Sequence, residues 1–302
     1  MELQPQPLTL DLARLDGLSQ RLIASHHENN YAGAVKRLNA IRVALAQLDW
    51  ATAPVFVING LKREELVAAN SAWLHALYFD VLGGDGVLSP GGLAVSIERD
   101  FGSFERWRAE FTGLAKAMGG GSGWALLSAS PGEGRLVTHW ASDHTQLLAG
   151  ATPILALDMY EHSYHMDFGA RATAYVDAFM KNVRFEAVES RYRAAVEADS
   201  VSLAVSPAAA AGAKQLVDVR RAQTYAQADD LLAGAVWHDP ARLAEWSPRL
   251  DRQTPVLVYC AHGHEIGRSV VLALRASGYD ARFIAGGIEA CREAGAALSP
   301  KA

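Results

Sequence analysis

The sequence predicts two parts: an α+β region, made of a helical hairpin and an α/β subdomain, followed by a small α/β domain with a parallel sheet. Three observations lead to this fold class. The 302 residues exceed the length of an average domain, roughly 100–200 residues. Apolar residues follow helical spacing early in the chain, whereas short apolar strands alternate with helical stretches late in it. Between them, residues 196–213 are rich in small side chains and are predicted to be a linker.

The helical hairpin is predicted over residues 1–85. Apolar side chains recur at helical spacing in its first helix: Leu38, Ile41, Leu45 and Leu48. A second apolar helix is predicted over 62–81. Gly83 and Gly84 follow it and favour its termination, since glycine adopts the backbone conformation that ends helices.

The α/β subdomain is predicted over residues 86–195. A helix over 103–118 places four apolar side chains on one face: Phe104, Trp107, Phe111 and Leu114. After a glycine-rich turn, strands are predicted over 124–130 and 135–140, and a last helix lies near 168–182.

The parallel-sheet domain is predicted over residues 214–302. Its strand candidates are 215–219, 255–260 and 281–284, with helical stretches between them. Short, continuously apolar strands that alternate with helices are typical of a parallel sheet covered on both faces.

Composition excludes several classes of protein. Half of the residues are hydrophobic and a fifth are charged, which excludes wholesale disorder. The net charge of −5 gives no basic balance, so we expect no nucleic-acid partner. No apolar run approaches the ~20 residues of a membrane span, so no membrane partner is expected. The N-terminus lacks a basic segment before an apolar run, and there are only two cysteines; a cytoplasmic location is expected.

Histidines concentrate early in the chain, where seven of the ten precede residue 166. Three segments that contain four of these histidines could jointly bind a metal: 25–28, 73–79 and 157–164. Asp158 and His162 are four residues apart, so on a helical turn they would share one face and could bind one cation. Imidazoles with a carboxylate suit iron or manganese better than structural zinc. The alternatives are a hydrogen-bonded core histidine at His75 and a chance pair at Asp158 and His162.

Cys260 lies between an apolar strand and a helical pattern that begins after a short loop. Loop amides and the positive end of the helix dipole are expected to lower the thiol pKa and to hold an anionic sulfur. A cysteine that simply packs at the end of a strand is the alternative, and position alone leaves both open.

Five segments of the first 195 residues resemble the ordered motifs of the iron/manganese superoxide dismutases: HHENNYAGAVKRLN, NSAWLHALYF, FGSFERWRAEF, GSGWALL and LDMYEHSYHMDFG. The resemblance implies that fold, with superoxide as substrate and dioxygen and hydrogen peroxide as products. It implies one Fe or Mn per dismutase domain, bound by His26, His75, Asp158 and His162. It also implies a homodimer in which Glu161 bonds His162 of the partner subunit.

The sequence departs from that family at positions around the metal. Asn30 and Ala34 stand where the family has its gateway histidine and channel tyrosine. Tyr31, one helical turn before Ala34, is a candidate to fill the role of that tyrosine. His165 replaces the second gateway tyrosine, and we consider it a candidate proton-delivery group.

The family's second-sphere glutamine, which donates a hydrogen bond to metal-bound solvent, is absent from both of its usual positions. Ser71 occupies one of them, and Asp143 and His144 lie at the other. A carboxylate is a poor donor, so His144 is the preferred substitute over Asp143.

The late segments LVDVRRAQTYAQADDLLAGAVW and PVLVYCAHGHEIGRSVVLALRASGYDARFIAGGIEA resemble a single rhodanese-like domain. The resemblance implies that Cys260 is a nucleophile that carries a persulfide, with unidentified sulfur donor and acceptor. Cys291 is expected to be a packing residue.

A cysteine phosphatase is the alternative for this domain, but its loop requires C-x5-R. Arg268 gives C-x7-R, and Glu265 would repel phosphate. The loop has no Arg or Lys before Arg268, which argues against thiosulfate as the sulfur donor.

Two functions follow as hypotheses. The first is a dimeric superoxide dismutase with an appended sulfurtransferase that uses a Cys260 persulfide. The alternative is a metal-binding dimeric scaffold with weak dismutase activity, which presents the sulfur carrier or a partner-binding module. Asn30 and Ala34 motivate the alternative, because the usual proton-relay groups are missing.

Overall fold

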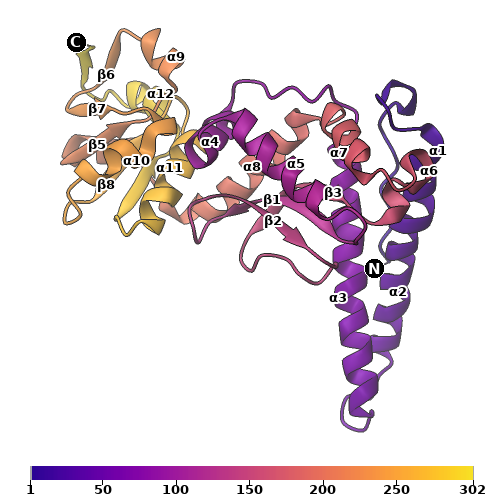
Figure 1. Cartoon of the computed structure of the whole chain (residues 1–302). Helices are drawn as coiled ribbons and strands as arrows, with labels where there is room; N and C mark the ends of the chain where they lie inside the picture. Colours follow the sequence, from indigo (N-terminus) through magenta and orange to yellow (C-terminus); the bar gives the residue numbers. More distant parts are fainter. Residues whose placement is uncertain (1, 302) are drawn as a thin grey trace.

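Two long helices lie side by side at one end of the molecule and form the predicted hairpin (Figure 1). A computed structural model describes residues 2–301. The hairpin elements are α1 (Gln20–Ser25), the π-helix η2 (His26–Tyr31), α2 (Ala32–Ala46) and α3 (Val55–Asp80). Leu38, Ile41 and Leu45 pack with Ala68 of the opposite helix. The apolar residues that recur at helical spacing in the sequence are therefore the ones buried between the two helices.

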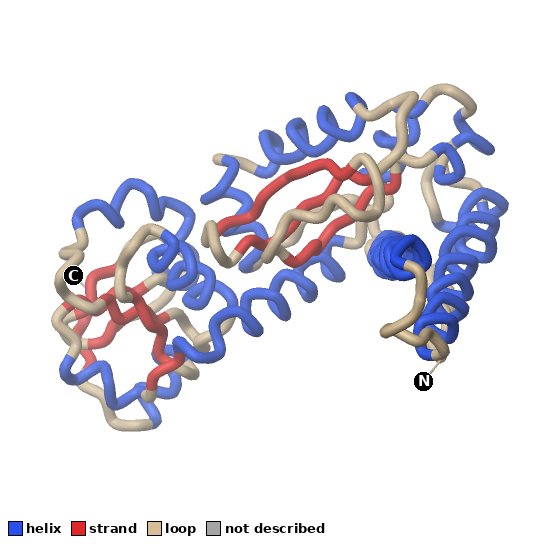
Figure 2. The backbone as a smooth tube through the Cα atoms, turned by 90° about the horizontal axis from the view of Figure 1, so that it is seen from below, coloured by secondary structure: helices blue, strands red, loops and turns tan. Residues whose placement is uncertain are grey.

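The next subdomain places helices on both faces of a three-stranded antiparallel sheet with strand order β2-β1-β3 (Figure 2). Its elements are α4 (Gly92–Phe101), α5 (Phe104–Ala117), β1 (Trp124–Ser130), β2 (Arg135–Ala141), β3 (Thr152–Asp158), α6 (His165–Phe168), α7 (Ala172–Lys181) and α8 (Phe185–Ser200), with the 3-10 helix η3 (Glu161–Ser163) after β3. Strand β3 was not predicted from the sequence, because its buried apolar residues show no polar alternation.

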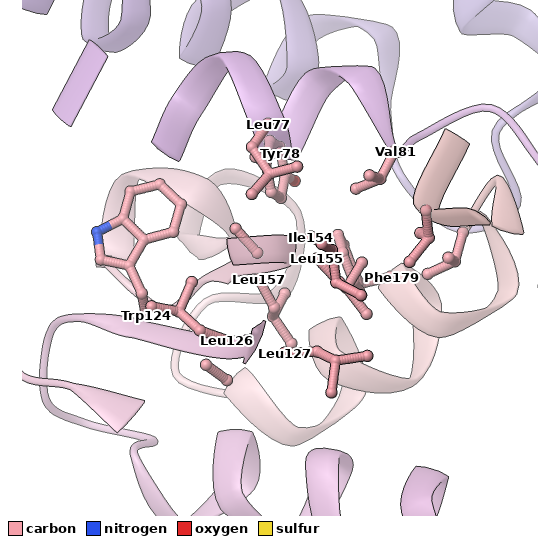
Figure 3. Close-up of a cluster of buried hydrophobic side chains, with 14 of the residues drawn as sticks. Leu77, Tyr78, Val81, Trp124, Leu126, Leu127, Ile154, Leu155, Leu157 and Phe179 are labelled. Carbon is pink, nitrogen blue, oxygen red and sulfur yellow. The ribbon is translucent and has the colours of Figure 1, made fainter. Parts of the chain in front are cut away.

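The apolar core joins this sheet to the hairpin (Figure 3). Leu77 and Tyr78 of α3 belong to the same buried apolar cluster as residues of β1 and β3, among them Leu126 and Leu157. All four are nearly or completely buried. The packing therefore holds α3 against the sheet close to the end of β3.

The C-terminal domain, residues 204–301, contains the predicted parallel sheet, with strand order β4-β9-β8-β5-β7. Separate apolar clusters cover its two faces, one with α11 and one with α12. Its strands are β4 (Ala204–Val205), β5 (Gln215–Asp218), β6 (Asp230–Leu232), β7 (Ala235–Trp237), β8 (Val256–Tyr259), β9 (Ala281–Ile284) and β10 (Leu298–Pro300). Its α-helices are α9 (Ala222–Ala226), α10 (Leu243–Trp246), α11 (Glu265–Ala276) and α12 (Gly287–Glu293).

The segment 196–213 is folded, unlike the linker expected from its composition. Helix α8 continues to Ser200, and β4 pairs in parallel with β9. Pro207–Gly212 form a 3-10 helix that contacts α12. Small side chains made this segment resemble a flexible connection, whereas its backbone hydrogen bonds place it in the sheet.

The two domains pack against each other through α8 and α11. Leu272 of α11 contacts the apolar core of the N-terminal domain, residues 2–203. Arg99 donates a hydrogen bond to Ser269 Oγ at 3.4 Å. A Cβ atom on Gly134 would overlap the backbone of Ala273, with Ala273 N at 2.8 Å, so glycine permits the close approach.

Among residues 2–301, no helix combines the length and the apolar character that crossing a membrane requires.

We expect Gly134→Ala to weaken the domain interface, because its Cβ would strike the backbone of α11. Overpacking of this kind typically costs about 1–3 kcal/mol. The measurement is limited proteolysis within 200–214, which should be several-fold faster than in the unmodified chain. Gly150→Ala is the matched control: Gly150 also has positive φ, but nothing lies within 4 Å of its added Cβ. Equal cleavage rates for the two variants would contradict a tight interface at Gly134.

Candidate metal centre and cysteine loop

Four side chains from four separate elements converge in the N-terminal domain. His26 comes from η2, His75 from α3, Asp158 from the end of β3 and His162 from η3. One ligand atom from each lies within 4.8 Å of all the others. Three of the four are buried and His162 is half-buried. The structure therefore brings together the four residues that the sequence analysis proposed as metal ligands.

One carboxylate oxygen is the centre of this cluster. Asp158 Oδ2 lies 3.0 Å from His26 Nε2, 3.1 Å from His162 Nε2 and 3.4 Å from His75 Nε2. The other oxygen, Oδ1, accepts a hydrogen bond from the Tyr160 amide at 2.8 Å. One oxygen is thus held by the backbone, and the other faces three imidazole nitrogens.

The chemistry of this donor set fits a cation. His75 Nδ1 lies 2.7 Å from the Ser71 carbonyl, which only accepts, so Nδ1 carries the proton and neutral His75 has its lone pair on Nε2. Burial lowers the pKa of His26 to about 4, so this imidazole is uncharged at neutral pH. Burial opposes ionisation of Asp158, but contacts with His162 and His26 outweigh it and hold its pKa well below the usual range. Three imidazoles and one carboxylate suit iron or manganese.

The backbone around Asp158 and His162 is not the helical turn considered in the sequence analysis. Asp158 ends a β-strand, and His162 lies in a 3-10 turn. Ser163 Oγ donates to the Asp158 carbonyl at 2.9 Å, which closes the turn. The proximity of the two side chains was predicted, but the helix was wrong, because a tight turn can also bring residues four apart together.

His144 is oriented by Trp124, whose indole Nε1 donates to His144 Nδ1 at 2.9 Å. Burial lowers the pKa of His144 to about 4, so the ring is neutral and its proton lies on Nε2. The other candidate, Asp143, instead accepts hydrogen bonds from the amide and hydroxyl of Thr145 in its own loop.

The ring of Tyr160 stacks on His144 and on His162, with ring centroids 4.9 Å and 5.5 Å away, respectively. His144 is thus a hydrogen-bond donor beside the cluster. The orienting role of Trp124 was not predicted, although this residue lies in the segment GSGWALL.

Tyr31 and His165 occupy other positions. The Tyr31 hydroxyl accepts a hydrogen bond from the Gln6 amide at 2.9 Å, and its ring packs near His27 and Phe79. His165 is exposed at the start of α6 and makes no side-chain hydrogen bond within residues 2–301. Neither side chain hydrogen bonds to the four clustered residues.

Cys260 follows β8 and is 4% exposed. Backbone amides of His262, Gly263 and His264 in the loop and of Gly267 in α11 favour the anionic sulfur and act to lower the thiol pKa. Burial nevertheless outweighs these amides and raises the thiol pKa above its usual value. The expected lowering of the pKa was therefore wrong, because the sequence does not show how deeply the strand end is buried. Cys291 is fully buried in an apolar cluster, as a packing residue would be.

A cleft of about 520 Å³ lies over Cys260 between the two domains. The N-terminal domain contributes residues from the start of α4 and from α8. The C-terminal domain contributes the cysteine loop and the neighbouring segment that includes Arg220 and Arg221. The Arg220 guanidinium is held by Asp218: its Nη2 donates a hydrogen bond to Asp218 Oδ2 at 2.6 Å. The cysteine thus faces a site built by both domains.

Two family profiles match the chain. Residues 89–191 match the profile described as "Iron/manganese superoxide dismutases, C-terminal domain". Residues 205–294 match the profile described as "Rhodanese-like domain".

Similar proteins match about three fifths of the chain. A protein of Cupriavidus metallidurans named as an iron superoxide dismutase is 65% identical over 191 residues, which cover 63% of this chain and 96% of the relative. An iron superoxide dismutase of Aquifex pyrophilus is 33% identical, covering 61% of this chain and 88% of the relative. A manganese superoxide dismutase of Halobacterium salinarum is 33% identical, covering 58% and 86%. The chain therefore belongs to the iron/manganese superoxide dismutase family, and a rhodanese-like domain follows its dismutase domain.

Proposed function

We propose that the chain disproportionates superoxide to dioxygen and hydrogen peroxide, with one iron or manganese ion held by His26, His75, Asp158 and His162. This proposal rests on one observation: the Nε2 atoms of the three histidines all lie within 3.4 Å of Asp158 Oδ2. The bound ion would supply the one-electron chemistry that superoxide disproportionation requires. Because the iron and manganese relatives both match the chain, we propose iron or manganese rather than one alone.

The residues around the ligands have separate roles in this proposal. The Ser71 carbonyl orients His75, and the Tyr160 amide orients Asp158. His144 donates from Nε2 to the solvent beside the ligands, which is the role the sequence analysis gave it. Tyr31 and His165 stay predictions as proton-delivery groups, since their side chains hydrogen bond elsewhere or not at all within residues 2–301.

We also propose a homodimer in which Glu161 bonds His162 of the partner subunit. Glu161 is exposed at the start of η3 and forms no ion pair within residues 2–301. Its carboxylate is adjacent in sequence to a ligand histidine, so a partner contact there would orient that ligand.

For the rhodanese-like domain we propose sulfur transfer through a Cys260 persulfide. The four backbone amides that favour the anionic sulfur, from the loop and the first turn of α11, and the cleft above it support this function. Amides that converge on a sulfur stabilise its anionic form once the thiol has lost its proton.

We expect His162→Ala to remove most of the bound metal, because one of four ligands is lost. The reduction should exceed the roughly 10–100-fold loss typical of a second-shell change. Metal content of the purified chain, measured together with superoxide turnover, tests this. His165→Ala changes an exposed histidine of the same segment and should keep its metal. Unchanged metal in His162→Ala would refute the ligand set, and turnover no faster than free metal would favour the scaffold alternative.

His144→Phe should keep the metal and the stacking on Tyr160 but lower superoxide turnover about 10–100-fold, because the donor is lost. His144→Gln, which can donate and accept, should retain more activity. Asp143→Asn is the matched control and should turn over as the unmodified chain does. A loss of turnover in Asp143→Asn, with none in His144→Phe, would reverse the assignment.

Incubation with a sulfur donor should add one sulfur atom to the chain, and cyanide should remove it. Intact-mass measurement detects the addition. Cys260→Ser should show none, whereas Cys291→Ser should behave as the unmodified chain, since Cys291 is fully buried. Sulfur addition that persists in Cys260→Ser would exclude this cysteine as the nucleophile.

A further inference from the structure

We propose that the dismutase domain completes the sulfur-transfer site, so that the interdomain cleft binds a small anion carrying a sulfane sulfur, of which thiosulfate is the simplest. In this site Arg193 of the dismutase domain neutralises Glu265 of the cysteine loop, and Arg221 contacts the anion. The inference rests on the proposed sulfur transfer at Cys260. The cysteine loop has no Arg or Lys before Arg268, so in this site the positive charges come from outside the loop.

The charges of the cysteine loop itself disfavour an anion. Glu265 lies in the first turn of α11, lines the cleft, and its side chain is only 11% exposed. Arg268 does not line the cleft: its Nε donates to the Gly263 carbonyl at 2.9 Å and its guanidinium to Ser200 Oγ at 3.2 Å. An uncompensated carboxylate near Cys260 would therefore repel an anionic donor.

The dismutase domain compensates this carboxylate. Arg193 of α8 lies with Nε 3.3 Å from Glu265 Oε2. A Cβ on Gly92 of α4 would overlap Glu265 Cγ, so the side chain fits because that residue is glycine. Glu189 of α8 accepts from the amides of Gly92 and Leu93 at 3.0 and 2.9 Å, which directs its charge to the start of α4. Of two acidic side chains in the cleft, Glu265 is thus paired with an arginine of the dismutase domain, and Glu189 is hydrogen bonded to backbone amides of that domain.

One positively charged side chain of the cleft remains available to bind the anionic donor. Arg220 is engaged by Asp218 and by the Asp230 carbonyl. Arg221 also lines the cleft, and its side chain has no hydrogen bond or ion pair within residues 2–301. Glu186 is the acidic lining residue left without such a partner, but it lies two helical turns from Arg193, roughly 10 Å along α8.

The cleft volume of about 520 Å³ suits a small molecule. The thiol of Cys260 loses its proton to water in the cleft, and the thiolate attacks the sulfane sulfur of the donor. A sulfur–sulfur bond forms at Cys260 while the donor's sulfur–sulfur bond breaks, and sulfite leaves with the bonding electron pair. Cyanide or a thiolate then attacks the outer sulfur and releases the Cys260 thiolate. No external oxidant or reductant is required.

Steady-state transfer from thiosulfate to cyanide by the full chain tests the inference. We expect Arg193→Gln to raise the KM for thiosulfate about tenfold, with kcat within about twofold, because Glu265 becomes uncompensated. The double variant Arg193→Gln/Glu265→Gln should restore KM, since the charge that needs compensation is gone. Arg221→Gln should also raise KM. With an uncharged dialkyl trisulfide as donor, Arg193→Gln should leave KM unchanged.

Arg242→Gln is the matched control. Arg242 is also 55% exposed and also bridges the domains, 3.7 Å from Glu98, but it does not line the cleft. Its KM should equal that of the unmodified chain. An unchanged KM in Arg193→Gln, no rescue by Glu265→Gln, or equal effects on charged and uncharged donors would overturn the composite anion site. A chain that forms no persulfide with any donor would instead overturn the proposed sulfur transfer.

Discussion

The buried Asp158 carboxylate is the group on which the arrangement of the dismutase domain depends. A buried carboxylate is strongly unfavourable unless other groups compensate it, and three imidazole nitrogens surround Oδ2. One of these imidazoles, that of His26, is 132 residues away in sequence. The chain therefore needs the packing of α3 on the sheet to bring His75 to Asp158, and the π-helix η2 to present His26. π-helical segments are frequent at functional sites, in keeping with this role.

The second domain is attached by packing rather than by a flexible connection. Helix α8 continues to Ser200 and β4 joins the second sheet almost at once. The same helix contributes Arg193 to the cleft over Cys260, while its partner α11 begins at Glu265. The interface between domains is thus also one wall of the cysteine site. The metal cluster and the cysteine remain separate sites, because no side chain of the cluster lines this cleft.

Much of this organisation could be predicted from the sequence, and the remainder depends on tertiary packing. Helical periodicity predicted α2 and α3, and apolar strands predicted the second sheet. The motif around Asp158 and His162 identified a ligand pair but placed it on a helix, since spacing alone does not distinguish a helix from a tight turn. The pKa of Cys260 was predicted in the wrong direction because burial depth is not visible in a loop sequence. Arg193 could not be identified at all, because its role arises only where two domains meet.

The central claim is that a single metal ion is bound at Asp158 by three imidazoles and one carboxylate. X-ray absorption spectroscopy of the iron-loaded full chain tests it most directly, because scattering from imidazole rings reveals how many histidines bind the metal. The account predicts one iron per chain, three imidazole ligands and no sulfur ligand. Iron bound by fewer than three imidazoles, or by a cysteine sulfur, would contradict it.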